Sequence, residues 1–262
     1  MQDKYVADIG DFGKYALLKY LRRERASRLG VVWYWVDPDD TDREHQRNDG
    51  KHVSYLGVNG MKPDLNLRAR DPDLFDQLHR LVTRKERGTR YVEENALLGN
   101  DTAFFSDSVS SATAYKKRNA WLVSALRTVS NADLVFLDPD NGLATGGRDG
   151  SKIGDAKYVL RDELREFWGT GARTLVLYHH PDRSQDHDTQ IPALARELES
   201  SLENSRVLPL RYRRGTSRAY FVIVPERKAA QWAQSLKNFA ACWPTRKIKG
   251  TVVSDFEFDK YH

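Results

Sequence analysis

The stretch Ala-Asp-Leu-Val-Phe-Leu-Asp-Pro-Asp-Asn-Gly, residues 132–142, decides the fold. Its apolar run is typical of a strand that is buried on both faces of a parallel sheet. The run stops at Asp138-Pro139, and proline fixes its own φ and restricts the preceding residue to extended geometry. We therefore expect Asp138 to be held at the carboxyl end of a central strand. The alternative is a turn in which Asn141 and Gly142 supply the turn residues.

Two other apolar strands end in polar residues in the same way. Residues 31–36 are followed by Asp37-Pro38-Asp39-Asp40, and residues 174–178 by His179-His180-Pro181-Asp182. In open α/β sheets, ligands bind outside the carboxyl ends of the strands. We therefore expect Asp37, Asp138 and His179 to converge on one crevice. Because side chains alternate along a strand, only one of the two adjacent histidines can face that crevice directly.

Helical and strand patterns alternate along most of the chain. The patterns predict helices over residues 11–25, 71–87, 112–129, 157–168, 190–202 and 226–239, and strands over residues 31–36, 91–92, 103–105, 132–137, 174–178, 206–212 and 218–224. A short turn joins the last two strands, which predicts an antiparallel hairpin. The order predicts an α/β fold with a doubly wound, mostly parallel, Rossmann-like sheet of about seven strands. We expect a single domain over residues 1–262, with an N-terminal helix over 11–25 and an irregular C-terminal tail over 243–262.

Composition limits the class of protein. Hydrophobic residues make up 40% of the 262, enough for a sizeable core, and no apolar run approaches the roughly 20 residues that span a bilayer. The N-terminus has no apolar signal-peptide region, and the single cysteine, Cys242, excludes an internal disulfide. We therefore expect a cytoplasmic protein without a membrane partner. The net charge of +5 permits a nucleic-acid partner, RNA or DNA, and is equally compatible with an ordinary solvated basic surface.

Three short motifs follow one another along the chain. Asp11-Phe12-Gly13-Lys14 is an acid–x–x–Lys pattern in the first helix, Val36-Asp37 ends the first strand, and Asp138-Pro139-Asp140-Asn141 ends the strand of residues 132–137. With the order of elements, they resemble the class I S-adenosylmethionine-dependent methyltransferases. The nearest resemblance is to the bacterial large-subunit ribosomal RNA adenine-N6 methyltransferases, whose tetrad is Asp-Pro-Pro-Tyr. This resemblance covers most of the chain in the order of its elements, but only about a dozen residues in detail.

The resemblance implies methyl transfer from S-adenosylmethionine to an amine of a nucleic-acid base. The implied catalytic residues are Asp138, Asp140 and Asn141. We add His179 to them because it also lies at a strand end. The implied cofactor-binding residues are Lys14, Asp37, Asp107 and Pro139. Asp138 and the backbone at Pro139 would hold the amine, and Lys14 would lie near the cofactor's carboxylate. Catalysis would consist mainly of positioning, because the methyl group is already activated. The base would have to be flipped or unpaired.

Differences from that family leave two other hypotheses open. Asp37-Pro38-Asp39 replaces the expected glycine-rich loop, and Asp140 and Asn141 replace the second proline and the aromatic residue of the tetrad. The second hypothesis is a Mg²⁺- or Mn²⁺-dependent nuclease or phosphoesterase. Its metal ligands would be Asp37, Asp39, Asp138, Asp140, His179 and Asp182. The third is a non-catalytic nucleic-acid-binding module that uses the basic cluster of residues 211–214.

Overall fold

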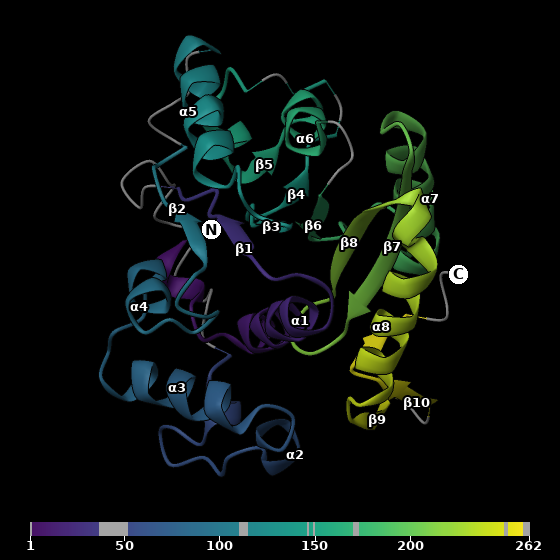
Figure 1. The fold of residues 1–262 in the computed structure, drawn as a ribbon. Helices are drawn as coiled ribbons and strands as arrows, with labels where there is room; N and C mark the ends of the chain where they lie inside the picture. Colours follow the sequence, from purple (N-terminus) through teal and green to yellow (C-terminus); the bar gives the residue numbers. More distant parts are fainter. Residues whose placement is uncertain are drawn as a thin grey trace.

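The computed structural model describes residues 2–36, 52–109, 115–145, 147–148, 150–169, 173–248 and 251–258. Its centre is a seven-stranded sheet (Figure 1). In sheet order the strands are β11 (Phe256–Glu257), β7 (Ser205–Tyr212), β8 (Arg218–Pro225), β6 (Thr174–His179), β3 (Leu134–Leu137), β1 (Leu29–Val32) and β2 (Ala103–Phe105). Strands β2, β1, β3 and β6 are parallel neighbours. Strand β8 is antiparallel to β6 and to β7, and β11 is antiparallel to β7.

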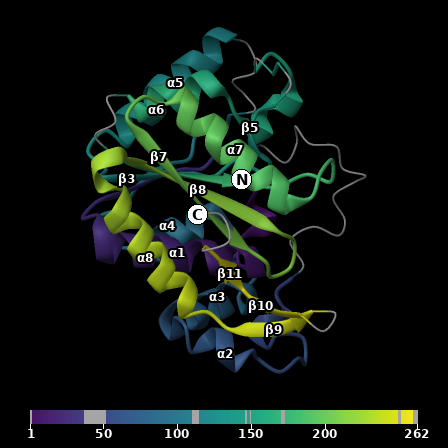
Figure 2. The ribbon, with the colours of Figure 1, turned by 90° about the vertical axis from the view of Figure 1, so that its right-hand side faces the viewer.

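Helices cover both faces of the sheet (Figures 1 and 2). On one face the core includes side chains from α1 (Ile9–Arg25), α3 (Pro72–Thr83), α4 (Thr89–Glu94) and α8 (Ala229–Ala241), with the short α2 (Leu65–Arg68) beside them. On the other face it includes side chains from α5 (Tyr115–Thr128), α6 (Arg161–Trp168) and α7 (His187–Ser201). Alternation along the strands sorts the two cores, since Phe136 joins the first and Leu137 the second.

Short elements complete the chain. Strands β4 (Gly142–Leu143) and β5 (Tyr158–Val159) form a parallel pair, and β9 (Thr245–Ile248) and β10 (Thr251–Ser254) form an antiparallel pair. The 3₁₀ turns are η1 (Asp3–Tyr5), η4 (Ser54–Leu56), η6 (Ile153–Lys157) and η7 (Glu226–Lys228). Among all the residues that the structure describes, no helix is long and apolar enough to cross a membrane.

The structure confirms the predicted α/β class, with a mostly parallel sheet of seven strands, and the antiparallel hairpin β7–β8. The prediction of an irregular tail over residues 243–262 is wrong for its described part. There β9, β10 and β11 form, and Phe256 pairs with Tyr212 at the sheet edge. Phe256 is 1% exposed and packs against the rings of Tyr212 and Trp243, so burial of aromatic surface draws this segment onto the sheet.

Two strand predictions also differ from the structure. Residues 91–92 belong to helix α4, where Val92 is buried in the core; a single apolar pair does not distinguish a strand from a helix turn. The first strand was expected over residues 31–36, whereas β1 comprises Leu29–Val32. Beyond it, Trp33 still donates its backbone N–H to the carbonyl of Phe105 at 3.0 Å, so the chain continues toward the same edge.

Gly30 allows α5 to end close against strand β1. A Cβ atom at position 30 would lie 2.8 Å from both Cβ and Cγ1 of Val129 and 3.0 Å from Cβ of Ala132. These distances are shorter than van der Waals contact, and β1 is paired on both sides by β2 and β3. The strand therefore cannot move aside without disturbing its ladders.

We expect Gly30→Ala to lower the free energy of unfolding by about 1–3 kcal/mol, because the added methyl group overpacks a filled core. Urea denaturation followed by circular dichroism measures this change. Gly154→Ala is the matched control, since no atom lies within 4 Å of a Cβ built there. Equal unfolding midpoints for the two variants would contradict the packing argument.

Candidate functional site

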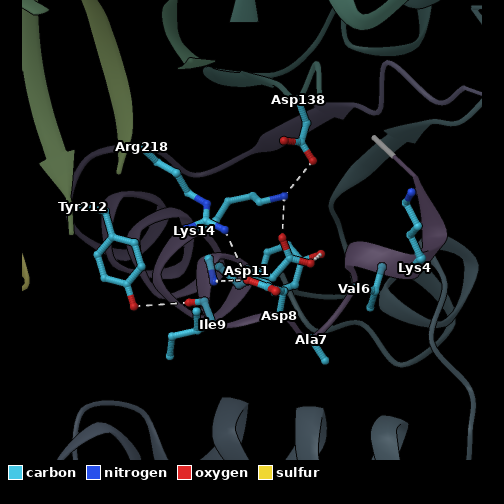
Figure 3. Close-up of polar contacts among 12 residues, drawn as sticks. Lys4, Val6, Ala7, Asp8, Ile9, Asp11, Lys14, Asp138, Tyr212 and Arg218 are labelled. Carbon is cyan, nitrogen blue, oxygen red and sulfur yellow. Dashed lines mark hydrogen bonds and ion pairs between the residues drawn. The ribbon is translucent and has the colours of Figure 1, made fainter. Parts of the chain in front are cut away.

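A buried charge cluster lies at the carboxyl end of β3 (Figure 3). The Lys14 ammonium lies 2.8 Å from Oδ2 of Asp138 and 2.7 Å from Oδ1 of Asp11. The three residues are 3%, 2% and 4% exposed in that order. Two of them come from helix α1, and the third, Asp138, directly follows β3, 124 residues from Lys14 in the sequence. The cluster therefore joins the N-terminal helix to the central strand through charge.

Local structure explains why these side chains meet. Asp8 caps helix α1 by accepting a hydrogen bond from the Gly10 N–H at 3.0 Å, and Asp11 and Lys14 lie one turn apart on the same helix face. On the strand, Phe136 faces the α1 side of the sheet, so Asp138, two residues later, faces the same side. The helix cap and the strand period together bring the ammonium to the carboxylate.

The Lys14 ammonium is enclosed by aromatic rings as well as by carboxylates. It lies 5.4–6.0 Å from the ring centroids of Tyr15, Trp33, Phe136 and Tyr178. Burial disfavours the charged form, but Asp11 and Asp138 outweigh it, so the pKa of Lys14 is raised above its ordinary value. Geometry and the raised pKa therefore both favour the charged form of Lys14.

A polar cavity of about 340 Å³ opens beside this cluster. Its lining carries four carboxylates, three cationic side chains, two histidines and two tyrosines. The lining residues are Tyr5, Asp8, Asp11, Lys14, His52, Asp138, Pro139, Asp140, Asn141, Lys157, Tyr178, His180, Thr216 and Arg218. Carboxylates thus exceed cations by one formal charge. Such a cavity favours a ligand that carries donors or positive charge.

A second ion pair crosses the cavity wall. Arg218, the first residue of β8, lies 3.2 Å from Oδ1 of Asp8, and its Nη1 also donates to the carbonyls of Arg214 and Thr216. Gly10 makes room for the guanidinium, because a Cβ there would overlap it. Arg218 therefore ties the β7–β8 hairpin to the start of α1.

The two adjacent histidines at the end of β6 face opposite sides of the sheet. His180 lines the cavity, whereas the His179 ring packs against Phe221 in the core on the α5 to α7 side. Nδ1 of His179 accepts the Leu143 N–H at 3.2 Å, and Gly142, with φ +113°, leaves room for the ring. The structure therefore does not bring His179 into the cavity, because Tyr178 and His180 occupy the strand positions that face α1.

Unlike His179, most of the other site residues predicted from the sequence line the cavity. Lys14, Asp138, Pro139, Asp140 and Asn141 are brought together there, and Gln2 donates to Oδ2 of Asp140 at 2.5 Å. Asp107 does not line it and is exposed just after β2. Asp37 and Asp39 lie outside the described residues.

The proposed metal-ligand set is not assembled in the described part of the chain. Asp182 is exposed and accepts hydrogen bonds from Ser184 and Gln190, which lower its pKa. His179 faces the other side of the sheet, as described above. Within residues 2–36, 52–109 and the later described ranges, no group of three or more His, Cys, Asp or Glu is arranged to hold a metal ion.

Sequence reasoning did not assign several residues that line the cavity. Asp11 was quoted only as part of a motif, and Asp8 and Arg218 were not assigned a role although they form an ion pair across 210 residues. The place of His180 could have been predicted from the sequence, because it lies two residues after Tyr178, which faces α1, and side chains two apart on a strand face the same side. Lys157 had no such signal, since its place depends on the hydrogen bond that its carbonyl accepts from Asn141 at 2.9 Å.

The basic cluster of residues 211–214 is largely neutralised within the protein. Arg211 lies 2.8 Å from Asp188, Arg213 lies 2.7 Å from Glu257, and Arg214 pairs with Asp64. These ion pairs fix the β7–β8 hairpin and the tail against the rest of the molecule. The cluster therefore presents less positive charge to a partner than the sequence indicates.

No protein family, curated protein or solved structure matched this chain in the comparisons made. The chemistry of the cavity therefore carries the assignment of function. Its ionised carboxylates accept hydrogen bonds only, so they complement an amine or another donor. Its concave form, with several polar groups that converge on it, is compatible with a ligand site.

We expect Lys14→Met to lower the free energy of unfolding by about 3–5 kcal/mol at pH 7, because it leaves two buried carboxylates without their counter-ion. Burial already raises the pKa of Asp11 above 3.8, and the substitution removes the charge that offsets burial. The folded variant therefore takes up protons more readily than the unfolded chain, so the loss of stability shrinks as the pH falls toward 4. Urea denaturation at both pH values measures it.

Arg68→Met is the matched control, since it removes an exposed ion pair of the same length, 2.8 Å, with Asp76. Its effect is expected to be less than about 1 kcal/mol. A Lys14→Met variant whose loss of stability did not depend on pH would argue against the buried ion cluster.

We expect the His179 ring to stay neutral down to acid pH. Burial, with a smaller effect from His180, lowers the pKa of His179 from 6.5 to about 4. The unfolded chain therefore binds the proton first, and the stability that this ring contributes above pH 6.5 is lost as the pH falls toward 4. NMR titration of the ring resonances tests this, and a midpoint near 6.5 would show that the ring is not buried as described.

Proposed function

We propose that this chain transfers a methyl group from S-adenosylmethionine to an exocyclic amine of a nucleic-acid base. The observation that carries the proposal is the Asp138 carboxylate, which Lys14 holds at 2.8 Å at the end of a central parallel strand. It stands on the wall of a polar cavity of about 340 Å³, within the roughly 300–1,000 Å³ range of small-molecule sites.

The sheet supports this proposal. Strand β8 runs antiparallel between β6 and β7, next to the four parallel strands β6, β3, β1 and β2, and the short antiparallel β11 lies beyond β7 at the edge. That arrangement resembles the class I methyltransferases. Helix α1 also brings the lysine of the acid–x–x–Lys pattern to the aspartate that begins the tetrad-like sequence, so two of the motifs behind the resemblance are in contact.

Asp138 would orient the amine. A carboxylate can accept hydrogen bonds from both N–H groups of an exocyclic amine. Pro139 lines the cavity beside Asp138. Lys14 holds Oδ2 of Asp138 at 2.8 Å, so Asp138 would act as a fixed acceptor that turns the nitrogen lone pair toward the methyl group. After transfer, the extra amine proton leaves toward the carboxylate or solvent. Most of the catalytic effect would come from this positioning.

The described residues fit the cofactor in two respects. The excess carboxylate of the cavity suits a cofactor that carries a sulfonium and an ammonium against one carboxylate. Asp107 is exposed just beyond β2 and does not line the cavity, so its carboxylate would accept hydrogen bonds from ribose hydroxyls only where the cofactor extends past the cavity. When bound, the cofactor supplies a methyl group that is already activated as a sulfonium. The acceptor base enters the cavity flipped or unpaired.

The nuclease hypothesis ranks lower because of where Lys14 lies. Its ammonium occupies the position between Asp11 and Asp138 that a bridging divalent cation would take. The binding-module hypothesis ranks lower because its arginine cluster is committed to internal ion pairs. The methyl-transfer proposal gives a role to the ion pair between Lys14 of α1 and Asp138 at the end of β3, and neither alternative does.

We expect Asp138→Asn to reduce methyl transfer to single-stranded nucleic acid at least about 100-fold, since the amide cannot serve as a charged acceptor. Affinity for S-adenosylmethionine, measured by calorimetry without metal, is expected to change little. Transfer of a radioactive methyl group measures the first quantity. Asp182→Ala is the matched control, because that carboxylate is exposed outside the cavity, and it is expected to leave both quantities unchanged.

Two outcomes would count against the proposal. One is the absence of saturable S-adenosylmethionine binding. The other is thermal stabilisation by Mg²⁺ or Mn²⁺ together with nuclease activity that Asp138→Asn abolishes, which would favour the metal-dependent hydrolase instead.

A further inference from the structure

Lys157 is held beside the Asp138 loop by the backbone. It is the last residue of η6, and its carbonyl accepts the Asn141 N–H at 2.9 Å. The next residue, Tyr158, pairs with Gly142 in the parallel β4–β5 ladder. Asn141 in turn accepts the His180 N–H at 3.0 Å, so the loop is fixed from two sides. Lys157 thereby lines the same cavity as Asp138.

Lys157 differs from the other two cations of the cavity in its bonding. Lys14 is bound by two carboxylates, and Arg218 is bound by Asp8 and two backbone carbonyls. In the described part of the chain, no hydrogen bond or ion pair engages the Lys157 ammonium, which is half-buried. An ammonium carries three N–H donors and no acceptor. Lys157 is thus the cation that the cavity offers to a ligand.

We infer that Lys157 recognises the ring nitrogen next to the acceptor amine, which makes it a specificity-determining residue. This inference rests on the proposed function. A carboxylate that accepts and an ammonium that donates, from two residues that line one cavity, complement the N=C–NH₂ edge of a base. Adenine presents that edge as its 6-amino group and N1, and cytosine as its 4-amino group and N3.

The tetrad-like sequence explains why a separate residue takes this role. Where the resembled family has a second proline and an aromatic side chain, this chain has Asp140 and Asn141. Asp140 is an acceptor already bonded to Gln2, and it cannot donate to a ring nitrogen. Asn141 offers only a neutral amide donor, whereas Lys157, brought there by η6, offers a charged one.

The test compares bases that differ only at the ring nitrogen. Oligouridylates that carry a single adenine, 1-deazaadenine, cytosine or 3-deazacytosine are titrated calorimetrically into the full chain, and methyl transfer to each is measured. The full chain is expected to bind and methylate the deaza form of one pair roughly 10- to 100-fold less well than its parent base, the loss expected for one hydrogen bond to a charged group. In Lys157→Met the difference within that pair is expected to disappear.

Lys152→Met is the matched control, since Lys152 is exposed, lies five residues earlier and does not line the cavity. It is expected to keep the full difference. Equal affinity of the full chain for each parent and deaza base overturns the inference, and so does a difference that survives in Lys157→Met or the absence of base binding. Base discrimination in binding without methyl transfer would instead support the role of Lys157 and refute the proposed function.

Discussion

Lys14 carries a full positive charge into the interior, and two carboxylates from different elements surround it at 2.7 and 2.8 Å. A buried charge costs several kcal/mol of hydration free energy, of the order that unfolds a domain, unless partners compensate it. This requirement fixes the distance between α1 and the end of β3. It also fixes Asp138 in position, so the same interaction that stabilises the fold prepares the cavity wall. The stability of the fold and the chemistry that we propose therefore depend on the same three side chains.

The strand period distributes the remaining polar groups. Asp138 has the parity of Phe136, and His180 that of Tyr178, so both side chains reach the α1 side of the sheet. His179 has the opposite parity and becomes a packed, neutral core residue with one acceptor in use. A pair of adjacent histidines thus separates into one cavity residue and one structural residue, although the sequence gives them the same chemistry.

Charge pairing separates structural cations from those that can bind a ligand. Arg211, Arg213 and Arg214 look like a nucleic-acid surface in the sequence, but carboxylates from α7 and the tail engage two of them and Asp64 the third. Lys157 stands alone in the sequence and nevertheless reaches the cavity with its ammonium exposed to a ligand. The three arginines are therefore held in internal ion pairs, and the cavity is where we propose that a cation meets a ligand.

The sequence by itself determined the class of fold and the strand end that carries Asp138, because an apolar run that stops at Asp138-Pro139 is a local signal. It also placed Lys14 and Asp138 in one site, through the resemblance of their motifs. Only the tertiary structure decided that the Lys14 ammonium bonds Asp138 directly, that Asp8 meets Arg218, and that β11 adds an edge strand. Such contacts join residues up to about two hundred positions apart, as Asp8 and Arg218 do with a separation of 210, so no local pattern encodes them. They form only when burial and charge compensation select one packing among those that the periodicities allow.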